Sequence, residues 1–193
     1  MTALQTFRLV FRTLSRTLFP SQGTPPPRQR RKALAEPLKT GDLVPFMAQT
    51  YRVRLVTTEG RAKLVEGQEE LVIHLTAGTG PEEQQRLLLR WYRQKFKALI
   101  PGLLTRWEPV VGVHAEAWGV KQMKTRWGTC NPRDKRIWLN LELAKKNQDE
   151  VEYVLVHELV HLLEPSHNAR FKALMTQFYP RWKVVSRGLK GIN

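Results

Sequence analysis

Two histidines and a glutamate near residue 160 have the spacing of a metal-binding helix. His157 and His161 are four residues apart, and Glu158 directly follows the first of them. Residues at i and i+4 lie one above the other on a helix, so both imidazoles can reach one ion. Glu158 is rotated by about 100° from His157, because the helix has 3.6 residues per turn. A carboxylate there can reach a water molecule at the ion, as in the H-E-x-x-H pattern of zinc hydrolases.

A catalytic zinc site needs a third protein ligand and one open position. His167 is the natural candidate, because Pro165 should end the helix near Glu164 and the following turn can direct the imidazole back. Glu164 is the alternative ligand, although it still lies on the helix. A structural zinc would usually be closed by four Cys or His ligands. We therefore predict a catalytic zinc bound by His157, His161 and His167. Such an ion lowers the pKa of a bound water molecule. We predict that Glu158 is the general base that takes the proton from this water.

The helix that carries the motif has start signals of its own. Asn147 or Asp149 can cap its N-terminus, and Glu150 and Glu152 suit the positive end of the helix dipole. Valines and leucines fill the positions between the polar ones and provide surface to bury. These features predict a well-packed helix that holds the histidines at fixed spacing.

Upstream of this helix the sequence predicts strands and one long helix. Alternating and apolar runs favour strands at residues 51–56, 62–65, 71–75, 110–113, 116–120, 121–127 and 136–140. A turn at 131–134 should join the last two strands as a hairpin, with a short helix at 141–146. A longer helix begins at Pro81 and should end before Pro101, because an internal proline removes a backbone hydrogen bond.

Composition divides the 193 residues into three parts. Residues 1–40 combine a basic segment with a Pro-rich linker, 41–120 form a stranded region plus a helix, and 121–193 contain the metal motif. Arginines interrupt the apolar run in the first 19 residues, which argues against a secretory signal. The segment could be an amphipathic helix on a membrane or a partner, an organellar transit segment or a poorly ordered terminus, and we favour the poorly ordered terminus or a partner-docking helix. The net charge of +15 favours anionic partners, nucleic acid among them.

Cysteine usage and hydropathy narrow the class of protein further. Cys130 is the single cysteine, so no intrachain disulfide can form, which favours a reducing, cytoplasmic location. No stretch of about 18 apolar residues is present, so we expect no transmembrane helix.

Several short motifs in the last 75 residues occur in the order of one known family. They are Arg126-Trp-Gly-Thr-Cys130, Ile137-Trp-Leu-Asn140, Tyr153-Val-Leu-Val-His-Glu-Leu-Val-His161, His167-Asn-Ala-Arg-Phe171 and Tyr179-Pro-Arg-Trp182. Residues 121–193 thereby resemble the YgjP-like (WLM/SprT-related) zinc metallopeptidases. The resemblance implies an α+β fold: a minimal zincin-like core with a small mixed or antiparallel sheet packed on helices, here preceded by a stranded N-terminal region.

The resemblance also implies roles for individual residues. It assigns the metal ligands to the three histidines and the base to Glu158. Four further positions match motifs beside the sheet edge that holds an extended peptide in related enzymes, namely Trp127, Gly128, Thr129 and Asn140. Tyr153, Tyr179, His114 and several arginines are candidates for stabilising the oxyanion.

Three functions follow from these features. The first is a zinc-dependent metallopeptidase that acts on a peptide or protein substrate. The second is a DNA-associated protease of SprT-like type, which the basic charge favours. The third is a non-catalytic, zinc-stabilised binding module docked through residues 1–40, against which the intact Glu158 argues.

Overall fold

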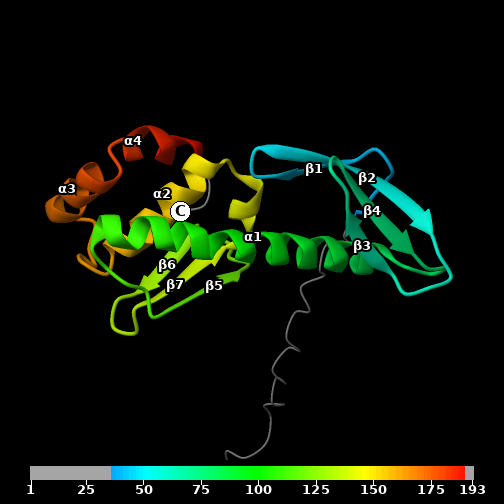
Figure 1. Ribbon diagram of the computed structural model, residues 1–193, viewed down its shortest axis with the longest axis horizontal. Coiled ribbons are helices and arrows are strands. Elements are labelled where there is room, and N and C mark those ends of the chain that lie inside the picture. Colours follow the sequence, from blue (N-terminus) through cyan, green and yellow to red (C-terminus); the bar gives the residue numbers. More distant parts are fainter. Residues whose placement is uncertain (1–35, 190–193) are drawn as a thin grey trace, which may run out of the picture. The chain divides into compact units, whose positions relative to one another are not determined.

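The computed structural model describes residues 36–189 of the chain, drawn in colour in Figure 1. The predictions for the basic N-terminal segment, and most of those for the Pro-rich linker, lie outside the described residues. The described part contains four α-helices and two small sheets. This confirms the predicted α+β class with a stranded region that precedes the core.

The first sheet is formed by the N-terminal strands in the order β1-β2-β4-β3, with β2 and β4 parallel. Its strands are β1 (Leu43–Phe46), β2 (Gln49–Thr57), β3 (Lys63–Glu66) and β4 (Glu70–Leu75). Aromatic rings from β1, β2 and the following helix meet edge to face, with Trp91 5.5 Å from Phe46 and 5.3 Å from Tyr51. These contacts hold the sheet against that helix.

Helix α1 (Pro81–Val111) is much longer than the sequence indicated. The prediction that it ends before Pro101 is wrong, and so is the predicted strand at 110–113. Ile100, Leu104, Trp107 and Val111 continue the apolar stripe at helical spacing and are buried. Burial of these four large side chains, at about 1.5–3 kcal/mol each, offsets the roughly 3 kcal/mol that each of the two internal prolines, Pro101 and Pro109, costs. The helix ends at Gly112, whose φ of 75° suits a residue without a Cβ.

The second sheet has the order β5-β7-β6, with β5 parallel and β6 antiparallel to β7. Its strands are β5 (Ala117–Lys121), β6 (Gly128–Asn131) and β7 (Arg136–Asn140). A hairpin is present near the predicted turn, but it joins β6 to β7. The strand predicted at 121–127 is wrong, because residues 122–127 form a loop. The side chain of Asn140 forms hydrogen bonds with backbone groups of Met123 and Arg126 in this loop, so these groups do not need a neighbouring strand as a partner.

The C-terminal part consists of short helices around one buried helix. These are η1 (Leu141–Lys145), α2 (Gln148–Val160), α3 (Ala169–Phe178), α4 (Trp182–Val185) and η2 (Ser186–Leu189). A capping box between Asn147 and Glu150 starts α2. It ends at Val160, four residues earlier than predicted, but His161 keeps right-handed helical backbone angles, so His157 and His161 retain their i, i+4 relation.

A buried carboxylate fastens α2 to α1. Glu152 is 5% exposed and accepts hydrogen bonds from Arg106 at 2.9 Å, the Trp107 indole at 3.1 Å and Gln148 at 2.7 Å. A buried carboxylate is stable only when its oxygens are satisfied in this way. The helix with the metal motif is therefore held in a fixed position against the longest helix of the fold.

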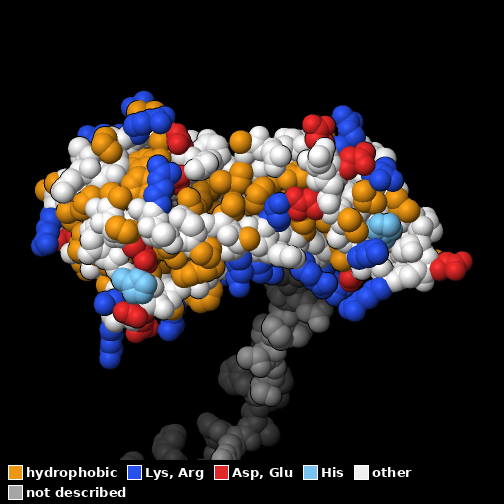
Figure 2. Space-filling model, in the orientation of Figure 1, with side chains coloured by type: hydrophobic (Ala, Val, Ile, Leu, Met, Phe, Trp, Pro, Cys, Tyr) orange, Lys and Arg blue, Asp and Glu red, His pale blue; other side chains and the backbone are white. Residues whose placement is uncertain are grey.

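The solvent side of α1 is basic. Arg86, Arg90, Arg93 and Lys97 are exposed and recur at helical spacing. Figure 2 shows Lys and Arg side chains gathered along the lower side of this helix. Within residues 36–189, no helix is both long and apolar enough to cross a membrane.

Candidate active site

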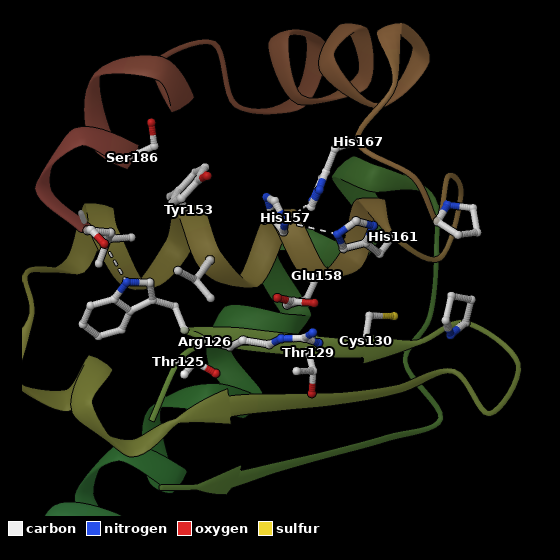
Figure 3. A pocket seen from close by; sticks show the side chains of 16 residues that line it. Thr125, Arg126, Thr129, Cys130, Tyr153, His157, Glu158, His161, His167 and Ser186 are labelled. Carbon is white, nitrogen blue, oxygen red and sulfur yellow. Dashed lines mark hydrogen bonds between the residues drawn. The ribbon is translucent and has the colours of Figure 1, made fainter. Parts of the chain in front are cut away.

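Three imidazoles from two neighbouring segments converge on one point. The Nε2 atom of His157 lies 3.1 Å from Nε2 of His161 and 3.0 Å from Nε2 of His167. The first two come from α2 and its C-cap, and the third from the turn before α3 (Figure 3). The structure thus brings together the three histidines that the sequence singled out.

Hydrogen bonding alone does not account for this cluster. A ring nitrogen carries either one proton or one lone pair, so Nε2 of His157 cannot bond to both neighbours. A tetrahedral zinc with bonds of about 2.0 Å would separate its nitrogen ligands by roughly 3.3 Å. The observed separations are close to this value, and the donor atoms of all three residues lie within 4.8 Å of one another. The donor set therefore fits a zinc ion.

The ring orientations and protonation states also suit metal binding. Nδ1 of His161 lies 3.1 Å from the carbonyl of Glu164, which leaves Nε2 free to bind an ion. Burial lowers the pKa of His157 to about 3, and the two neighbouring histidines add to this effect. Its imidazole is therefore neutral at pH 7 and has a lone pair to donate.

Helix α3 supports the third histidine. Asn168 caps this helix by accepting a hydrogen bond from the Phe171 amide, which fixes the turn that carries His167. The Phe171 ring lies 4.7–4.8 Å from the ring centroids of all three histidines. Phe171 is a site residue whose role the sequence analysis missed. Its spacing of four residues after His167 on an amphipathic helix was the available signal.

Glu158 lies beside the imidazoles and is free to react. It is 5% exposed, and its carboxylate makes no hydrogen bond or ion pair with the described residues. Burial raises its pKa to about 8, and the charge of Arg126 partly offsets this increase. A buried, unpaired carboxylate in a cleft is typical of a catalytic acid or base.

The glycine at position 128 makes room for this carboxylate. A Cβ atom on Gly128 would lie 2.4 Å from Oε1 and 2.8 Å from Cδ of Glu158, well inside van der Waals contact. The backbone of β6 therefore packs directly against the Glu158 side chain, and no other residue type leaves this space.

A cleft of about 740 Å³ runs past these groups. Figure 3 shows the three imidazoles on one side of Glu158 and Arg126 with Thr129 on the other. The lining comprises Thr125, Arg126, Trp127, Gly128, Thr129, Cys130, Pro132, Tyr153, Val154, His157, Glu158, His161, Pro165, His167, Ser186 and Leu189. The cleft thus lies between the edge strand β6, helix α2 and the C-terminal η2.

The four residues predicted to bind substrate divide into two groups. Trp127, Gly128 and Thr129 line the cleft, whereas Asn140 is completely buried behind it. The Asn140 amide accepts hydrogen bonds from the backbone amides of Met123 and Glu142, and donates to the carbonyls of Met123 and Arg126. These bonds use both N–H groups and both oxygen lone pairs of the amide, so none is left for a substrate. Substrate binding by these residues stays a prediction, and the geometry favours a positioning role for Asn140.

The candidates for oxyanion stabilisation also separate. Tyr153 lines the cleft, with its ring centroid 5.9 Å from that of His157. The Tyr179 hydroxyl donates instead to the carbonyl of Asp149. His114 does not line the cleft, and its Nδ1 atom lies 2.9 Å from a carboxylate oxygen of Glu108. Tyr153 and Arg126 are the members of this set that the fold brings to the site.

The single thiol gives a test of this environment. Burial raises the pKa of Cys130 to about 12, and the charge of Glu158 adds to the increase. Because the thiolate is the reactive form, we expect iodoacetamide to alkylate Cys130 of the folded, metal-free protein at pH 8 on the order of 10³-fold more slowly than in urea. The alkylation rate of the folded protein should increase steadily between pH 8 and pH 10, because the fraction of thiolate increases with pH. Equal rates in the folded and unfolded protein would contradict this environment.

Comparison with known protein families identifies the class of this protein. The family model described as "YgjP-like, metallopeptidase domain" matches residues 26–191. The chain therefore belongs to the YgjP-like family, as the resemblance in its C-terminal motifs indicated, and its family implies a metal cofactor.

The crystal structure of the metallopeptidase zymogen of Pyrococcus abyssi abylysin is similar with a TM-score of 0.44 and 20% sequence identity, over 47% of this chain and 90% of that chain. The search of curated proteins gave no match.

Proposed function

We propose that the protein is a zinc-dependent peptidase in which Glu158 is the general base. The observation that carries this proposal is the convergence of three Nε2 atoms beside a buried carboxylate with no partner among the described residues. Three imidazole ligands favour zinc over magnesium or calcium, which prefer oxygen ligands. His157, His161 and His167 would hold the ion.

The chemistry divides between the ion and the protein. When bound, zinc would lower the pKa of the attacking water and polarise the scissile carbonyl. Glu158 takes the proton of the attacking water and returns it to the leaving amine. Burial raises the pKa of Glu158 to about 8 in the absence of the ion, and the positive charge of a bound ion would lower it again, so that the carboxylate is ionised and can accept a proton near neutral pH. Gly128 keeps the carboxylate in place, and Phe171 keeps the imidazoles together.

The free edge of β6 is the proposed binding site for the peptide. β6 pairs with β7 on one side only, so its other side can accept an extended chain as an additional strand. Gly128 and Thr129 would provide backbone hydrogen bonds there. Trp127 would support this edge, because its indole N–H donates to the carbonyl of Leu189 at 2.8 Å.

Metal content and peptide hydrolysis test the proposal together. We expect one zinc per chain in the purified protein, and none in a His161→Ala variant, whose remaining two histidines cannot complete a catalytic site. A chelator should abolish cleavage of a casein substrate, and added zinc should restore it. Circular dichroism would verify that the variant is folded. A folded wild-type protein that takes up no zinc would overturn the proposal.

A second candidate function is proteolysis of proteins held on nucleic acid. It is favoured by the stripe of exposed cations on α1, formed by Arg86, Arg90, Arg93 and Lys97. Such a row of cations can follow a phosphate backbone. The nucleic-acid partner stays a prediction.

A further inference from the structure

We propose that Arg126 binds a carboxylate of the peptide substrate, close to the scissile bond and on its C-terminal side. This inference rests on the proposed peptidase function and names the class of substrate that the cleft selects. Its starting point is the charge of the cleft. Arg126 is the single Lys or Arg in the lining, and Glu158 is the single acid.

The guanidinium group of Arg126 has no partner within the described part of the chain. Its side chain is exposed to the cleft and forms no ion pair within 4.0 Å and no hydrogen bond with residues 36–189. Other arginines do find carboxylates: Arg54 pairs with Glu70, and Arg106 pairs with Glu152. An arginine fork that faces a cleft is well suited to a bidentate bond with a carboxylate that enters it.

The backbone that carries Arg126 is firmly held. Its carbonyl accepts a hydrogen bond from the buried amide of Asn140 at 2.8 Å. The next residue, Trp127, is fixed at its carbonyl by the Asn140 backbone and at its indole by Leu189, both at 2.8 Å. Anchoring of the backbone lowers the entropy lost on binding, because only the side chain of Arg126 remains to be ordered when a ligand arrives.

Strand direction determines which part of the substrate meets the guanidinium. If the peptide pairs with β6 in the antiparallel direction, as β7 does on the other side, it runs from the Cys130 end of the strand toward its Gly128 end. Its C-terminal half then passes Arg126, which precedes Gly128 by two residues. Figure 3 shows the Arg126 side chain extending toward Glu158, so the contact falls within a residue or two of the bond that is cut.

Two sources can supply this carboxylate, an acidic side chain or the free C-terminus of the substrate. Both would present the same group to the same guanidinium. The experiment therefore needs one pair of peptides for each source. The first pair differs by Glu or Gln at the second position after the scissile bond, within a longer amidated peptide. The second pair ends at that position, either as the free acid or as the amide.

The test measures both cleavage and binding with the full-length zinc protein. We expect kcat/KM of the wild type to be at least about tenfold higher for the carboxylate member of one pair, as a charge-assisted hydrogen bond provides. Arg126→Gln should bring this ratio close to one, and Arg126→Glu should invert it. The control Arg52→Gln removes an exposed cation on β2, outside the cleft lining, and should leave the ratio unchanged. The same preferences should appear in the Kd of the peptides for the inactive Glu158→Gln variant.

The outcomes separate the two proposals. If the wild type cleaves peptides but shows no carboxylate preference in either pair, the role of Arg126 is refuted while the peptidase function stands. Equal loss of kcat on all peptides in Arg126→Gln would also refute it, and would assign Arg126 to transition-state stabilisation. If the wild type cleaves no peptide and binds none, both proposals fail.

Discussion

Glu158→Gln is expected to lower kcat/KM for peptide hydrolysis by about 10²–10⁴-fold, the usual contribution of a general base. Glutamine has nearly the same shape, so it fits the space beside Gly128 and leaves the three imidazoles undisturbed. Its amide cannot accept the proton of the attacking water. Zinc content, measured by inductively coupled plasma mass spectrometry, should stay at the wild-type level while turnover is lost.

A second buried carboxylate on the same helix provides the control. Glu150 is 7% exposed and belongs to the capping box at the start of α2, away from the cleft lining. Glu150→Gln keeps the capping geometry and should retain activity. If Glu158→Gln keeps more than a tenth of wild-type activity, another group is the base. If the wild type itself binds zinc but cleaves nothing, the non-catalytic binding module becomes the better interpretation.

Gly128→Ala is expected to lower kcat by about 10²-fold or more without unfolding the protein. The added methyl group would collide with the end of the Glu158 side chain, which can rotate away at little cost to stability. A displacement of about 1 Å in a catalytic group is enough for such a loss. Steady-state kinetics, zinc content and thermal melting of the variant measure the three quantities separately.

Gly102→Ala is the matched control for this substitution. Its added methyl group meets nothing within 4 Å, and it lies in α1 far along the sequence from the site. We expect normal activity from this variant. Wild-type kcat in Gly128→Ala would mean that the carboxylate does not depend on the space left by the glycine, and the arrangement of β6 against α2 would need revision.

The histidine cluster was predictable from local spacing, whereas the long helix was not. The i, i+4 relation depends on a few neighbouring residues, so it could be predicted from the sequence, although the helix ends four residues before the position that Pro165 indicated. The continuation of α1 past Pro101 depends on the burial of Leu104 and Trp107 against elements that follow much later in the chain. At this position tertiary packing outweighs the local helix-breaking effect of the proline.

The same distinction applies within the site. The loop at 122–127 was mistaken for a strand because its polar partner, Asn140, is contributed by β7 after a turn. The contact between Gly128 and Glu158 joins residues 30 positions apart, and composition gives no sign of it. Residues whose function comes from a distant partner are therefore the ones that the sequence alone does not assign.

Helix α1 contacts both sheets and should therefore couple their folding. Its buried apolar residues extend from Leu87 to Val111 and belong to one continuous hydrophobic core, and the helix contacts both β3 of the first sheet and β5 of the second. Loss of the first sheet would expose the N-terminal half of the helix and weaken the Arg106 and Trp107 contacts that hold Glu152. Helix α2 should therefore melt together with the strands of the first sheet, which do not line the cleft, in a single transition.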